Sequence, residues 1–153
     1  EIDAYIPDTY IKDGHQKIEM YKRFRGAENL EDIEELQAEM LDRFGEYPEE
    51  VDYLFQIAEI KVYALLNGVE QIKQVKQEVT ILVNEQVTGE IDGSKIFHIG
   101  NQFGRNIIPG MEGSKLKIMI KTKEYDTAGW LHIVQEMVKG VSLAKRGQGN
   151  PVN

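Results

Sequence analysis

The stretch PEEVDYLFQIAEIKVYALLNG, residues 48–68, decides the fold. Pro48 suits the first turn of a helix, where its missing N–H is not needed, and Asn67-Gly68 supplies a stop. The apolar residues in between form two stripes: Val51, Leu54, Phe55, Ala58, Val62 and Leu65 on one, and Ile57, Ile60 and Ala64 on the other. A helix that is apolar on so much of its circumference is central and is covered on more than one side.

Two shorter helices are predicted upstream of this central helix. Asp13 and Gln16 have the spacing of a helix cap, which places a first helix from about Gly14 to Arg25. Its expected inward residues are Ile18, Tyr21 and Phe24. Asn29 can cap a second helix, which Gly45 ends, and its expected inward residues are Ile33, Leu36, Met40 and Phe44. Residues 1–13 should form an extended lead-in that docks through its large side chains.

Downstream of Gly68 the hydrophobic period changes from helical to alternating. Residues 71–84 predict two strands with a turn near Gln77-Glu78, and residues 106–122 predict a second strand pair around a turn at Gly110 to Gly113. A short helix is expected between the pairs, with Ile96, Ile99 and Phe103 at helical spacing and Gly104 as a stop. A last amphipathic helix should bury Trp130, Ile133, Val134, Met137, Val138 and Val141.

The predicted fold class is therefore α+β, with an N-terminal three-helix segment followed by antiparallel strand pairs with two further helices. We expect one domain over residues 1–146, comprising the lead-in 1–13, a helical half 14–68 and an α+β half 69–146. Two small halves packed together fit the length of 153 residues equally well. Residues 147–153 are expected to be a disordered tail.

Composition excludes several classes of function. The formal net charge of -8 would repel a phosphate backbone, so direct nucleic-acid binding by this domain is disfavoured. The absence of cysteine removes disulfides, thiolate metal sites and cysteine nucleophiles, and it suits a cytoplasmic protein. No apolar run approaches the ~18 residues of a membrane span. Because the chain opens on Glu1 without a methionine, we interpret it as a fragment of a longer protein.

No motif in the sequence indicates catalysis. His15, His98 and His132 lie far apart without a partner at i+4, which is typical of surface or packing residues and not of a metal pair. The phosphate-binding pattern Gly-x4-Gly-Lys-Ser/Thr is absent, so the glycines of residues 89–113 are interpreted as turn residues. The sequence thus predicts no catalytic, cofactor-binding or metal-binding residues and no cofactor. A hydrolase or nuclease that uses paired carboxylates and a divalent metal is the alternative, which metal titration would test.

One feature has a geometry that suggests binding. Acidic residues recur at alternating steps of three and four along the second predicted helix: Glu28, Asp32, Glu35, Glu39, Asp42 and Glu46. They should form a single stripe roughly opposite the inward residues, with Arg43 as the one base within the helix. Like charges at i and i+4 destabilise a helix by about 0.2 to 0.5 kcal/mol per pair, so the stripe suggests a basic partner. A solvated face that keeps the protein soluble is the other interpretation.

Two segments carry a resemblance to a known family. They are YIPDTYIKDGHQKIEMYKRF and LQAEMLDRFGEYPEEVDYLFQIAEIKVYALLNGVEQI, and the DRFG turn, the proline three residues later and the LLNGV ending are together specific. The chain resembles, over nearly its whole length, the carboxy-terminal domain of the bacterial transcription-repair coupling factors (Mfd). The strand region after Val69 is less diagnostic.

The resemblance implies a regulatory role. Members of this family are ATP-dependent DNA translocases that engage stalled RNA polymerase and recruit the excision repair protein UvrA, with motor motifs outside this domain. The carboxy-terminal domain is expected to pack on an intramolecular UvrB-like module, mask its UvrA-binding surface and restrain the motor. Protein-interaction residues are then Glu35, Glu39, Asp42 and Glu46, of which Glu39 and Asp42 match family positions that face arginines of that module. A module for a separate basic protein partner is the alternative.

Overall fold

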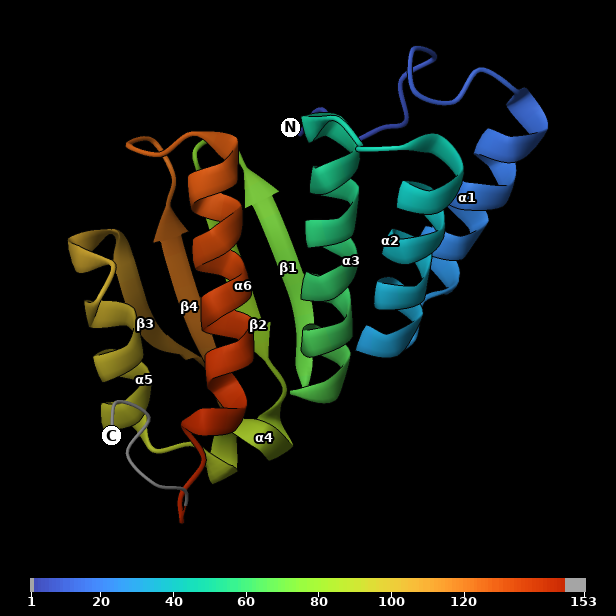
Figure 1. Cartoon of the computed structure of the whole chain (residues 1–153). Helices are drawn as coiled ribbons and strands as arrows, with labels where there is room; N and C mark the ends of the chain where they lie inside the picture. Colours follow the sequence, from blue (N-terminus) through green and yellow to red (C-terminus); the bar gives the residue numbers. More distant parts are fainter. Residues whose placement is uncertain (1, 148–153) are drawn as a thin grey trace. The chain divides into compact units, whose positions relative to one another are not determined.

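The computed structural model describes residues 2–147 and divides the chain into two compact units, residues 1–62 and 63–153 (Figure 1). Residue 1 and most of the expected disordered tail, residues 148–153, lie outside the described residues. The units meet within one helix, α3 (Glu49–Leu66), so the boundary falls six residues before the expected change from helical to α+β half. In residues 2–147, no helix has the length and apolar character that a membrane span requires.

The first unit contains a strap, residues 2–13, followed by helices α1 (Gly14–Gly26) and α2 (Leu30–Phe44) and most of α3. The strap is not extended throughout as predicted, because the Tyr10 and Ile11 N–H groups donate to the Pro7 carbonyl and form a turn at residues 8–10. Local signals set these bounds. The Asp13 carboxylate accepts from the backbone N–H groups of His15 and Gln16 at 2.8 and 3.2 Å, which confirms the predicted cap of α1. Gly45 ends α2 with a φ of 82°, a left-handed value that glycine adopts without a steric penalty.

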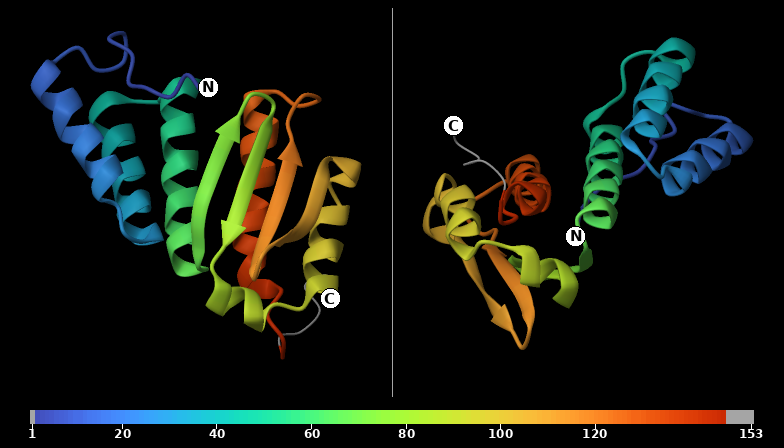
Figure 2. Two further views of the ribbon diagram at one scale, coloured as in Figure 1. Left: turned by 180° about the vertical axis from the view of Figure 1, so that it is seen from behind. Right: turned by 90° about the horizontal axis from the view of Figure 1, so that it is seen from below.

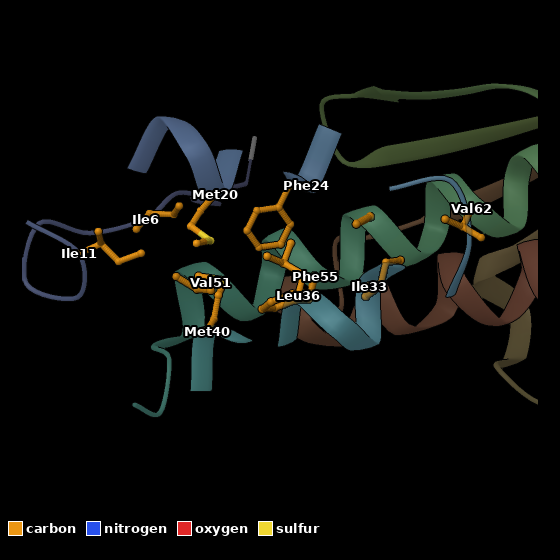
Figure 3. Close-up of a cluster of buried hydrophobic side chains, with 11 residues drawn as sticks. Ile6, Ile11, Met20, Phe24, Ile33, Leu36, Met40, Val51, Phe55 and Val62 are labelled. Carbon is orange, nitrogen blue, oxygen red and sulfur yellow. The ribbon is translucent and has the colours of Figure 1, made fainter. Parts of the chain in front are cut away.

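A single hydrophobic cluster holds the first unit together (Figure 3). The strap and all three helices contribute to it: Ile6, Ile11, Met20, Phe24, Ile33, Leu36, Met40, Val51, Phe55, Ala58 and Val62. The prediction that Ile18 faces inward was wrong, because α1 turns Met20 into the cluster and leaves Ile18 55% exposed. Leu65 is also misplaced in the prediction. It is 75% exposed, because α3 leaves the cluster after Val62.

The second unit is built on a four-stranded antiparallel sheet in the order β1-β2-β4-β3. Its strands are β1 (Val69–Val75), β2 (Glu78–Val83), β3 (Ile107–Glu112) and β4 (Lys115–Lys121). The two predicted strand pairs are present, and pairing of β2 with β4 joins them into one sheet. Successive side chains of a strand point to opposite faces of the sheet, and one face of the central strands is buried. On that face Val79, Ile81, Ile118 and Ile120 are at most 1% exposed.

Both hairpin turns overlap the predicted positions and are displaced from them by a few residues at most. The first uses Lys76 and Gln77, and Glu78 already begins β2. The second lies at Gly113 and Ser114, whereas Gly110 is paired within β3. The reason is that β3 is an edge strand, where the missing N–H of Pro109 is tolerated, and that Gly113 adopts the positive φ of 61° needed in the turn.

Helices α5 (Gly93–Asn101) and α6 (Thr127–Leu143) lie on one face of this sheet, as the two views of Figure 2 show. All six residues predicted for the inward face of the last helix are buried. Gly140 of α6 sits so close to α5 that an added Cβ would lie 3.1 Å from Ile99 Cγ2. Phe103 lies beyond the end of α5, before the 3-10 turn η1 (Gly104–Asn106), so its expected helical position was wrong.

The fold class is α+β as predicted, with one helix more than expected. Helix α4 (Glu85–Glu90) is six residues long and has no buried residue, so it lacks the apolar period that reveals a helix. The sequence signal that could have predicted α4 is its N-cap residue, Asn84. The Asn84 side chain accepts from the Val87 backbone N–H at 2.8 Å, and Glu85 stands in the first turn.

Candidate protein-interaction site

The candidate site is the acidic surface of α2, and local contacts explain why this helix forms. The Asn29 side chain accepts from the Asp32 N–H at 2.8 Å, and the Asp32 carboxylate accepts from the Glu28 N–H at 2.9 Å. The arrangement is a variant of the capping box, in which the Asp32 side chain reaches past the N-cap Asn29 to the residue before it. Asp32, predicted as a member of the acidic stripe, therefore satisfies the start of its own helix.

Glu39 is also engaged within the unit. Its carboxylate forms an ion pair with Arg23 of α1 and a second one, at 2.7 Å, with Arg43 one turn along α2. Arg43 also lies 3.5 Å from Glu19 of α1. Hydrogen bonds from Arg23 and then Arg43 hold the pKa of Glu39 below its ordinary value. Sequence reasoning found Arg43 but missed Arg23, which lies sixteen residues away and approaches Glu39 only in the folded unit.

The other predicted acids remain directed to solvent. Glu35, Asp42 and Glu46 are exposed, and within residues 2–147 no ion pair involves any of them. The helical period places Glu31 on the same line as Glu35 and Asp42, opposite the buried side chains of α2, and Glu31 is exposed too. The outward acidic line is thus Glu31, Glu35 and Asp42, continued by Glu46 beyond the helix. Glu39 lies beside it, toward α1, and not within a single stripe as predicted.

Charge is unevenly divided between the two units. Residues 1–62 contain 7 Lys and Arg against 17 Asp and Glu, whereas residues 63–153 contain 11 against 9. The acidity of the whole chain therefore resides in the helical unit. A surface of one sign attracts partners of the opposite sign and repels phosphate groups. The arrangement favours binding of a basic protein surface.

Other surfaces offer less chemistry. In the described part of the chain, no three His, Asp or Glu side chains are grouped as metal ligands. A hollow between α5 and α6 is lined by His98, Ile99, Asn101, Gln102, Glu136, Lys139, Gly140 and Leu143. In this hollow the Lys139 Nζ lies 3.6 Å from the Glu136 Oε2 and also stands over the Tyr63 ring. The charges of Glu136 and Lys139 therefore compensate each other.

Comparison with known proteins is consistent across the chain. The model of the family described as TRCF domain matches residues 1–94. The transcription-repair-coupling factor of Bacillus subtilis (strain 168) is 56% identical over 146 residues, which is 95% of this chain and 12% of that protein. The transcription-repair-coupling factor of Staphylococcus aureus (strain USA300) is 34% identical over 145 residues, again 95% of this chain and 12% of that protein.

A solved structure agrees with the sequence matches. The crystal structure of the C-terminal domain of a transcription-repair coupling factor aligns with a TM-score of 0.81 and 28% sequence identity, covering 97% of this chain and 92% of the other. By contrast, the chain spans only about an eighth of the length of the curated relatives, 12% in each case given.

Proposed function

This chain belongs to the TRCF domain family, and on that premise we propose that it is a regulatory, autoinhibitory domain of a transcription-repair coupling factor. The resemblance stated from the sequence is confirmed at the level of the family. In the proposed role the domain packs on the UvrB-like module of the same cytoplasmic polypeptide and masks its UvrA-binding surface. It restrains the motor until RNA polymerase is engaged, and it performs no chemical step of its own.

The outward acidic line on α2 carries this proposal. Glu35, Asp42 and Glu46 are exposed on the unit that holds the excess negative charge. Glu31 and Glu35 stand one turn apart on this line, where like charges repel one another, and a basic surface relieves that repulsion. We therefore assign Glu35, Asp42 and Glu46 to the contact with the module. We assign Glu39 to the edge of the contact, where it already shares its charge with Arg23 and Arg43.

The strength of such a contact suits a reversible switch. An exposed ion pair contributes about 0.2 to 1 kcal/mol, so three pairs cannot hold two separate proteins together. Within one polypeptide the effective concentration reaches the millimolar range, which is enough to close a weak contact. An effector such as RNA polymerase that couples by about 1 to 3 kcal/mol can then open it.

UvrA binding by the full-length coupling factor that carries this domain tests the proposal. We compare the wild type with a Glu35→Arg/Asp42→Arg variant, which reverses charge at two exposed positions. Glu39→Arg is a poorer choice, because it would place a third guanidinium beside Arg23 and Arg43 and disturb folding. The control for the effect of charge reversal elsewhere on the domain is Glu124→Arg, at an exposed acid of the second unit.

The expected result is tighter UvrA binding by the double variant than by the wild type and the control, at equal thermal stability. Equal UvrA binding by all three proteins would refute the proposal that this acidic face masks the UvrA-binding surface. The alternative, a separate basic protein partner for the same face, predicts that the isolated 153-residue chain binds that partner in solution and that the double variant does not.

A further inference from the structure

The strap of residues 2–13 contacts the C-terminal end of α2 through Tyr10. The Tyr10 hydroxyl donates to the Gly45 carbonyl at 2.7 Å and lies 3.2 Å from the Met40 carbonyl. The hydroxyl has one proton, so the shorter contact to Gly45 is the principal hydrogen bond. The Tyr10 ring packs beside Phe44, with 5.9 Å between the ring centroids.

The carbonyls at the end of a helix have no partners within the helix and need donors from elsewhere. At the end of α2, the Gly45 N–H donates to the Leu41 carbonyl, and the Tyr10 hydroxyl donates to the carbonyl of Gly45 itself, the residue that caps the helix. A tyrosine hydroxyl is protonated throughout the neutral range and can donate, and burial raises the pKa of Tyr10 further above its ordinary value. The turn stabilised in this way begins next to Asp42 and leads directly into Glu46.

The strap is attached at few points. Ile6 and Ile11 are buried, and the Ile6 N–H donates to the Tyr21 hydroxyl at 2.7 Å. Between these anchors the chain forms one turn, in which the Tyr10 and Ile11 N–H groups donate to the Pro7 carbonyl, and Asp8 meets Lys17 at the surface. Tyr5, just before Ile6, is 46% exposed. A segment that lies outside every helix and sheet, and that has half of its residues exposed, opens more easily than the helices on which it packs.

We propose that residues 2–13 act as a latch, whose attachment through Tyr10 sets the C-terminal turn of α2 and whose lifting loosens the part of the acidic face formed by Asp42 and Glu46. The inference rests on the proposed function for its regulatory consequence. In that role, a movement that lifts the strap weakens the contact between the acidic face and the basic module.

Hydrogen exchange of the 153-residue chain tests the local mechanism. Tyr10→Phe removes the hydroxyl and keeps the ring. Tyr5→Phe is the matched control, because the structure assigns its hydroxyl no hydrogen bond among residues 2–147. Loss of one hydrogen bond predicts amide exchange about two- to tenfold faster over residues 42–47 in Tyr10→Phe and unchanged in Tyr5→Phe. Unchanged exchange there, or an equal acceleration throughout residues 14–62, overturns the latch.

A second measurement connects the latch to regulation. In the full-length coupling factor, Tyr10→Phe should raise UvrA binding in the same direction as Glu35→Arg/Asp42→Arg, while Tyr5→Phe leaves it unchanged. If only the charge-reversal variant raises UvrA binding, the latch is wrong and the proposed function stands. If local exchange accelerates but neither variant changes UvrA binding, the latch mechanism is supported and the proposed function fails.

Discussion

Replacing Glu39 by Gln removes the charge that links α1 to α2 and keeps the shape of the side chain. The carboxylate meets Arg23 and Arg43, and the Glu39 side chain is 33% exposed. An exposed ion pair contributes about 0.2 to 1 kcal/mol, so the two pairs together contribute on the order of 0.4 to 2 kcal/mol. Because each partner is also about one-third exposed, solvent screening favours the lower half of that range, and we expect a loss of about 1 kcal/mol.

The loss should depend on pH in a defined direction. Arg23 and then Arg43 lower the pKa of Glu39 in the folded unit. A carboxyl group with a lowered folded pKa stabilises the fold at pH values above its unfolded pKa of about 4.3. That contribution is lost as the pH falls through the folded pKa. The difference between wild type and Glu39→Gln should therefore be full at pH 7 and shrink below about pH 4.

Urea unfolding followed by circular dichroism measures this difference at a series of pH values. The control is Asp42→Asn, an acid-to-amide change on the same helix at an exposed residue, which should shift the free energy of unfolding by less than about 0.5 kcal/mol. The reasoning is refuted if Glu39→Gln and Asp42→Asn are equally stable at pH 7, or if the effect of Glu39→Gln is the same at pH 7 and pH 3.

Two matched pairs test the packing in each unit. Gly100→Ala should lower the free energy of unfolding by up to about 2 kcal/mol, since its Cβ would lie 2.9 Å from Ile107 Cγ2 and overpacking outweighs the gain in helix propensity. Gly89→Ala, with open space around the new Cβ, should raise it by about 0.5 to 1 kcal/mol; urea unfolding that ranks the two variants equally contradicts the packing argument. Met20→Ala should cost about 2 to 5 kcal/mol and Ile18→Gln less than about 0.5 kcal/mol, and a reversed order in the same assay would mean that α1 buries its other face.

Signals within a few residues of one another were sufficient to predict much of the fold. Asp13 and Asn29 cap their helices, Gly45 ends α2, and the period of α6 identified its buried residues. Helix ends and amphipathic faces depend on neighbours up to four positions away, which the sequence displays directly. The exceptions were short or marginal cases. Helix α4 has too few residues to show a hydrophobic period. Helix α1 is so polar that the sequence did not show whether Met20 or Ile18 is the buried residue.

The candidate site was predicted in composition but not in detail. The sequence by itself determined that α2 is a helix with acids on its solvent side, because that follows from a period of 3.6 residues. Only the tertiary structure decided which acids remain unpaired, since Arg23 reaches Glu39 through the packing of α1 on α2. The same holds for the strap, where Tyr10 meets Gly45 across thirty-five positions, and for the pairing of β2 with β4. Such contacts form only when the intervening chain brings distant residues together, and no pattern among neighbouring residues predicts which distant residues will meet.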